Sequence, residues 1–156
     1  MQKQRRLFLR ASLAAGTATI AVAAGLLTPQ AVLGNWSKKA FENENLEATI
    51  KEITGLSGPE PSAEINVKTP VVAENGAVVS VTVEHNIPGA ESLSILVPEN
   101  TNKLAASYLL SGQVASFVNC RIKMRKTSDV IAVIKADGKL YSGKSRVKVT
   151  LGGCGG

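Results

Sequence analysis

The sequence predicts an all-β protein: an immunoglobulin-like seven-stranded antiparallel β-sandwich with an N-terminal helix and a flexible C-terminal arm. From residue 62 onward apolar and polar residues alternate with a period of two, which is typical of half-buried strands. Turn residues interrupt this alternation at short intervals, as they do in β-sandwiches. Upstream the apolar spacing is helical, and after residue 151 four glycines surround one cysteine. A small barrel is the alternative architecture.

The first 34 residues have the composition of an export signal. Arg5 and Arg6 precede Phe8 and Leu9, and an uncharged Ala/Gly/Thr/Leu run follows from residue 11 to residue 27. This pattern resembles a twin-arginine signal, so we expect residues 1–34 to be cleaved after export of the folded chain to the periplasm. A membrane anchor is the alternative, but the run is short for a span and is diluted by glycine and threonine. We therefore expect no membrane attachment in the mature protein.

The net charge of the chain depends largely on this signal. The 156 residues include 18 basic and 12 acidic side chains, and four of the basic ones lie before residue 35, where there is no acidic residue. The mature chain would carry 14 basic and 12 acidic residues, which does not favour nucleic-acid binding. One basic cluster remains in the body, formed by Arg121, Lys123, Arg125 and Lys126. It predicts either a solvated strand face or a docking surface for an acidic partner.

A helix is expected between residues 35 and 55. Its apolar positions recur at helical spacing: Trp36, Ala40, Phe41, Leu46, Ile50 and Ile53. Gly55 and the Gly58-Pro59 pair end the pattern. We assign residues 35–58 to this helix and its linker, residues 59–151 to the sandwich, and residues 152–156 to the arm.

Seven strands are expected in the sandwich domain. They are residues 64–69, 77–85, 93–97, 105–110, 114–126, 130–136 and 140–151. Turn sequences such as Asn75-Gly76, Pro88-Gly89 and Asp137-Gly138 separate them. In the last strand Val147, Val149 and Leu151 share one face. We expect this strand to hold the chain in the sheet until the glycines begin.

The body of the chain offers no catalytic constellation in its sequence. His85 is the only histidine, and its place at a strand end predicts a surface or packing residue. There is no Cys-x-x-Cys pair, no acidic cluster and no phosphate-cradling glycine loop. We therefore predict no metal site, no cofactor, and no catalytic residue of the chain's own.

The two cysteines differ in their surroundings. Cys154 stands between Gly152 and Gly153 on one side and Gly155 and Gly156 on the other, so its thiol is carried on a narrow segment of high conformational freedom. Cys120 alternates with polar neighbours in the predicted strand 114–126 and should face inward. Either it is an inert buried thiol, or it forms a bridge to Cys154.

The C-terminal sequence Val-Lys-Val-Thr-Leu-Gly-Gly-Cys-Gly-Gly, residues 147–156, resembles the C-terminus of the SoxY family, the sulfur-carrier subunits of SoxYZ complexes in bacterial sulfur oxidation. Residues 75–79, 88–92 and 104–107 are similar to that family as well, and the export signal agrees with it. Cys120 is a departure, because the family is known for a single carrier thiol.

The resemblance implies a non-catalytic periplasmic carrier that holds thiosulfate- or sulfide-derived intermediates on Cys154, including a cysteine persulfide. It implies as partners a SoxZ-like subunit in a heterodimer or larger assembly, a c-type cytochrome that loads sulfur, a dimanganese hydrolase that releases sulfate and, in pathways that have one, a sulfane dehydrogenase. An alternative consistent with the same residues is an exported structural sandwich module whose Cys154 forms an intermolecular disulfide.

Overall fold

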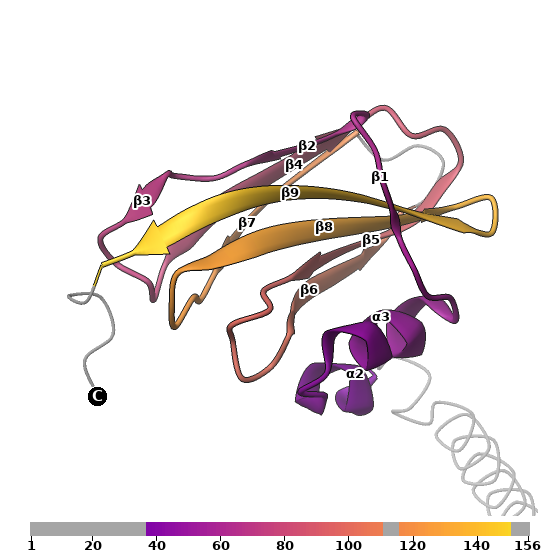
Figure 1. Cartoon of the computed structure of the whole chain (residues 1–156). Coiled ribbons are helices and arrows are strands. Elements are labelled where there is room, and N and C mark those ends of the chain that lie inside the picture. The colour runs from indigo at the N-terminus through magenta and orange to yellow at the C-terminus, as the bar shows by residue number, and fades with distance from the viewer. Residues whose placement is uncertain (1–36, 111–115, 151–156) are drawn as a thin grey trace, which may run out of the picture. The chain divides into compact units, whose positions relative to one another are not determined.

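The computed structural model describes residues 37–110 and 116–150, which contain two stacked β-sheets and two short helices (Figure 1). The larger sheet has the order β1-β9-β8-β5-β6, and β3 also pairs with β9. Its strands are β1 (Glu60–Pro61), β3 (Val72–Ala73), β5 (Ala90–Leu96), β6 (Leu104–Leu109), β8 (Ser128–Ala136) and β9 (Lys139–Val149). The smaller sheet has the order β2-β4-β7. Its strands are β2 (Ile65–Lys68), β4 (Val79–His85) and β7 (Phe117–Ile122). The predicted β-sandwich is confirmed.

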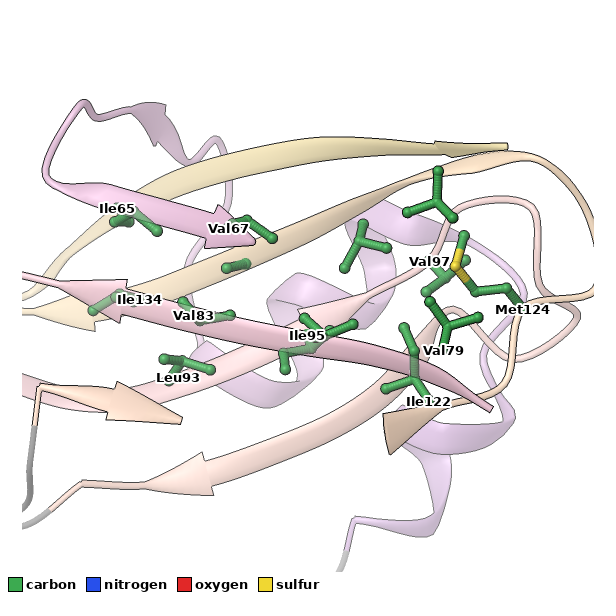
Figure 2. Close-up of a cluster of buried hydrophobic side chains, with 14 of the residues drawn as sticks. Ile65, Val67, Val79, Val83, Leu93, Ile95, Val97, Ile122, Met124 and Ile134 are labelled. Atoms are coloured by element: carbon green, nitrogen blue, oxygen red, sulfur yellow. The ribbon is translucent and has the colours of Figure 1, made fainter. Parts of the chain in front are cut away.

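The core between the sheets follows from the alternation of side chains along each strand. In β4, Val79, Val81 and Val83 are each at most 1% exposed, and the residues between them face outward. Figure 2 shows Val79 and Val83 against apolar side chains of the opposite sheet, among them Leu93 and Ile95. Each such side chain contributes roughly 1.5–3 kcal/mol of transfer free energy when buried.

At two positions, Gly143 and Gly76, neighbouring segments approach the backbone so closely that a side chain would collide with them. A Cβ added at Gly143 of β9 would lie 2.7 Å from both Ile65 Cγ2 and the Ile65 carbonyl oxygen, so only glycine lets β9 pass this close to β2. At Gly76 an added Cβ would lie 2.9 Å from Val149 Cγ1 and closer still to the Met124 carbonyl oxygen. Gly76 therefore permits the chain before β4 to contact the ends of β7 and β9.

All seven predicted strands are present, and two further strands were not predicted. These are β1 and β3, which pair in parallel with β9 and have two residues each. Two residues are too few to produce a periodic pattern, so sequence alone does not indicate them. The predicted strand 114–126 is shorter in the structure, where β7 ends at Ile122. The β8–β9 hairpin turns at Asp137 and Gly138, both with positive φ, as a two-residue turn of type I′ requires.

The single predicted helix is divided into α2 (Lys38–Glu42) and α3 (Leu46–Thr54). The division occurs because Asn45 acts as an N-cap: its Oδ1 accepts a hydrogen bond from the Ala48 amide at 2.9 Å. Ala40 and Ile50 pack against Leu96 and Val133 on the outer face of the larger sheet. Neither helix within the described residues is long and apolar enough to cross a membrane.

The predicted signal, residues 1–34, and the predicted arm, residues 152–156, lie outside the described residues, as do Trp36 and Leu151. The boundaries assigned to them stay predictions.

Candidate functional site

Cys154 and the four glycines around it lie outside the described residues, so the site is defined by the structure that leads to it. Thr150 is the last described residue before this segment. Its amide donates to the Ala73 carbonyl at 3.1 Å, and the Lys148 amide donates to the Val71 carbonyl at 2.9 Å. β3 and the residue before it thus hold the end of β9 from one side, and the chain stays fixed to the sheet up to Thr150.

Thr127 holds the end of β9 from the other side. Its hydroxyl oxygen accepts a hydrogen bond from the Val149 amide at 3.0 Å and lies 3.5 Å from the Val149 carbonyl oxygen. Cys154 is four residues beyond Thr150, and an extended chain covers at most ~3.6 Å per residue. The Cα of Cys154 is therefore tethered within about 14 Å of a well-fixed point of the sandwich.

A groove of about 1060 Å³ lies at the same end of the sandwich. One wall is the connection between β5 and β6, and the other is the end of β7 with the connection to β8. Figure 1 shows both connections and the end of β9 together at this end of the two sheets. The charged residues that line the groove are Glu99, Lys103, Arg121, Lys123, Arg125 and Lys126. Five positive side chains against one negative side chain make the groove strongly basic.

Asn100 joins the two walls of this basic groove. Its Nδ2 donates to the Lys123 carbonyl at 2.6 Å, and its Oδ1 accepts from the Arg125 amide at 3.0 Å. The Arg125 guanidinium also donates to Thr101 Oγ1 at 2.9 Å, and Lys103 Nζ donates to the Asn100 carbonyl at 2.7 Å. These hydrogen bonds hold the two walls together. The ammonium groups of Lys123 and Lys126 take part in none of the ion pairs of the described residues.

The four basic residues that the sequence predicted as one cluster all line this groove. Sequence reasoning missed Lys103 and Asn100, because they lie in a connection far from β7 in sequence. Pro98, Glu99 and Asn100 are typical of a turn, but nothing in these three residues indicates which strand the loop contacts.

Cys120 lies on the inner face of β7, as predicted, but it is half-buried rather than fully enclosed. Its thiol is free. Tyr108 of β6 contacts it, so these two residues connect the edge strands of the two sheets. Burial, a hydrogen bond to Cys120 and repulsion from a Cys120 thiolate together raise the pKa of Tyr108 to about 12. The predicted alternative, a bridge between Cys120 and Cys154, depends on residues outside the described part.

His85 is a packing residue, at 9% exposure, at the opposite end of β4 from Val79. Burial lowers its pKa, and a hydrogen bond with the Ile87 backbone partly offsets this effect. Its Nδ1 is buried without a hydrogen-bond partner among the described residues. In that same part of the chain, no three His, Cys, Asp or Glu side chains converge as metal ligands.

The sequence matches the family of the sulfur oxidation protein SoxY over residues 50–154, a region that ends at Cys154. The chain belongs to the SoxY family. Among solved structures it resembles the sulfur carrier protein SoxY from Chlorobium limicola f thiosulfatophilum with 39% identity and a TM-score of 0.62. That match covers 68% of this chain and 96% of the other.

The structure of a superoxide reductase (neelaredoxin) from Ignicoccus hospitalis also matches, with 15% identity and a TM-score of 0.48. That match covers 56% of this chain and 83% of the other, and it supports no functional argument. No curated protein sequence matches the chain. Membership in the SoxY family supports a carrier role in sulfur oxidation and implies a SoxZ partner subunit.

Proposed function

We propose that this protein is a periplasmic sulfur carrier that holds thiosulfate- or sulfide-derived intermediates covalently on Cys154. The observation that carries the proposal is the family match over residues 50–154, which includes Cys154 in its Gly-Gly-Cys-Gly-Gly context. The geometry at the end of β9 supports it, because Thr150 is fixed to the sandwich only four residues before the thiol. The twin-arginine pattern in residues 1–34 supports delivery to the periplasm.

Loading with thiosulfate would be an oxidation. The Cys154 thiol loses its proton, its sulfur forms a bond to the outer sulfur of thiosulfate, and two electrons leave to a pair of ferric c-type haems on a partner cytochrome. The product is a cysteine S-thiosulfonate with one negative charge. A dimanganese hydrolase would then add water to the terminal sulfur, which releases sulfate and one proton and leaves a cysteine persulfide, Cys–S–SH. A sulfane dehydrogenase would oxidise that persulfide in pathways that have one.

Cys154 itself is a plain thiol in this scheme. A thiol near its ordinary pKa of ~8.5 is only a few per cent thiolate at neutral pH, and residues 151–156 contain no cation that would stabilise the thiolate. Activation therefore belongs to the partner enzymes. A carrier benefits from this division, because its thiol is quiet between visits and becomes a nucleophile inside each enzyme.

The glycines explain how one thiol would serve several enzymes. Glycine has no side chain to collide with the walls of a narrow channel, and it permits backbone conformations closed to other residues. The SoxZ subunit would accompany the sandwich, and export of folded cargo through the twin-arginine route would carry the partner with it.

Intact-mass analysis of the purified mature protein tests the proposal. We expect adducts that correspond to added sulfur after exposure to sulfide, and to thiosulfonate after exposure to thiosulfate, in each case with the cognate cytochrome as the two-electron oxidant. The adducts should vanish in Cys154→Ser and persist in the matched variant Cys120→Ser. Protein that only dimerises through Cys154 and gains no sulfur under any of these conditions would instead identify a structural sandwich module.

A further inference from the structure

The basic groove is an unusual concentration of charge for a chain whose mature part would carry 14 basic and 12 acidic residues. Five of the basic side chains line one groove, where Glu99 is the only acidic side chain. Four basic side chains elsewhere in the described residues form ion pairs, those of Lys38, Lys68, Lys135 and Arg146. None of the ion pairs of the described residues involves a groove side chain. No ion pair of the described residues neutralises these five positive charges, so the groove attracts anions.

The end of β9 lies beside this groove. Thr127 binds the Val149 backbone and directly follows Lys126 of the groove. Met124 lies between two other groove residues, Lys123 and Arg125. Its amide donates a hydrogen bond to the Gly76 carbonyl at 2.7 Å. The same Gly76 is closely approached by Val149 Cγ1. Fixed contacts thus join the groove wall to the last residues of β9. A segment that leaves Thr150 begins next to the groove.

We propose that the basic groove is a resting site for the C-terminal segment 151–156 when Cys154 carries an anionic sulfur adduct, with the adduct's sulfonate group bound by Lys123 and Lys126. The inference rests on the proposed function, because that function supplies the anion. Cys154 is within about 14 Å of Thr150, and the ammonium groups of lysine reach several ångströms further toward it. A sulfonate has three oxygen acceptors and a full negative charge, which suit ammonium and guanidinium donors.

Such a site would distinguish the states of the carrier by charge. The thiosulfonate adds a negative charge that the free thiol and a neutral adduct lack, so the lysines would hold the loaded segment more tightly than the unloaded one. The thiosulfonate is retained by contacts that partner enzymes must break. Because the groove is open and polar, the retention would be weak and sensitive to salt, which is appropriate for an adduct that must leave again.

The test is an amide NMR comparison on the purified mature protein together with any partner subunit that copurifies, in a Cys120→Ser background. Tetrathionate loads Cys154 without a cytochrome: the thiolate attacks an inner sulfur, a Cys–S–S–SO3⁻ group forms, and thiosulfate leaves. A methylthio adduct, made with a methanethiosulfonate reagent, is the neutral control of similar length. Intact mass verifies a single adduct in each sample.

We expect the thiosulfonate to shift the amide signals of Asn100, Thr101 and Arg125, and the methylthio adduct to leave them in place. The shift should be lost in Lys123→Gln/Lys126→Gln and in 1 M salt, where the Debye length is only ~3 Å. The charge-matched control Lys139→Gln/Lys144→Gln, on exposed lysines outside the groove, should retain it.

Absence of the shift at these three amides, or an equal shift from the neutral adduct, would overturn the proposal. It would also be overturned if the groove variant kept the shift but lost a copurifying partner, since the groove would then be a docking surface for an acidic protein. Chemical loading keeps these outcomes separate from a failure of the proposed function, which is tested instead with sulfide or thiosulfate in the presence of the cognate cytochrome.

Discussion

Thr127 and Val149 form a two-sided contact at the point where β9 ends. The Val149 amide donates to Thr127 Oγ1 at 3.0 Å, and that same hydroxyl lies 3.5 Å from the Val149 carbonyl oxygen. The β8–β9 ladder pairs Ser128 with Val147, so Thr127 extends the hold of β8 on β9 by two residues. This contact holds the end of β9 five residues before Cys154.

Replacing Thr127 by alanine should release the end of β9. We expect hydrogen exchange of the Val149 amide to accelerate about fivefold, because a typical intramolecular hydrogen bond contributes ~1 kcal/mol. Thr127→Ser keeps the hydroxyl and should preserve slow exchange. If the alanine variant exchanges at the wild-type rate, other contacts hold this end of the strand and the role given to Thr127 is wrong.

Stability should decrease as the solution is acidified through the pKa of His85. Burial lowers the pKa of His85 in the folded state below its ordinary value of 6.5, so near and below pH 6.5 the unfolded chain binds more protons than the folded chain. The free energy of unfolding therefore falls as pH drops below 6.5. Urea unfolding at pH 7.5 and pH 5.5 measures the difference.

His85→Gln is the control, because His85 is the only histidine and no other imidazole can contribute. Carboxylates titrate equally in both proteins, so the variant should show a smaller loss of stability between the two pH values. Identical losses in the two proteins would show that His85 is not the group responsible.

Tyr108 should titrate abnormally late. Its pKa is raised to about 12, first by burial and then by Cys120, so the folded state retains the phenol proton where an exposed tyrosine loses it. The stability linked to this proton is fully present below pH 10 and is lost as pH rises from 10 through 12. Tyrosinate absorbance of a Tyr141→Phe variant reports Tyr108 alone, since the chain has two tyrosines.

Cys120→Ala in that background should lower the pKa of Tyr108 without restoring its ordinary value, because burial is the largest cause of the shift. Full return to about 10 would mean that Cys120, and not burial, determines the titration. Cys120→Ser keeps a hydrogen-bond acceptor and should give an intermediate result.

The sequence was informative where each residue's surroundings follow from its own strand. Alternation predicted a strand over residues 77–85 and placed Cys120 on the inner face of its strand, and the structure confirms both. It missed the helix break at Asn45, because the apolar spacing runs through a local N-cap without a change of period.

The candidate site shows a different limit. Basic residues of one strand and its turn were visible in the sequence, but the groove exists only because Asn100 bonds to Lys123 and Arg125 across more than twenty residues. A polar connection between strands has no periodicity, so its packing partner cannot be read from the pattern. The two-residue strands β1 and β3 were missed for the same reason.

Replacing Gly153 by valine should impair sulfur transfer while leaving the fold intact. A β-branched side chain widens the segment and restricts its backbone, so Cys154 would enter a partner's active site poorly, and misplacement of a reacting group can cost on the order of tenfold or more in rate. The core residues that stabilise the sandwich lie between Ile65 and Val147, so the thermal unfolding midpoint should not change. Thiosulfate-dependent reduction of the cognate cytochrome measures the first effect, and Gly153→Ala, with its smaller side chain, should be less affected. Normal turnover in the valine variant would contradict entry of this segment into a narrow channel.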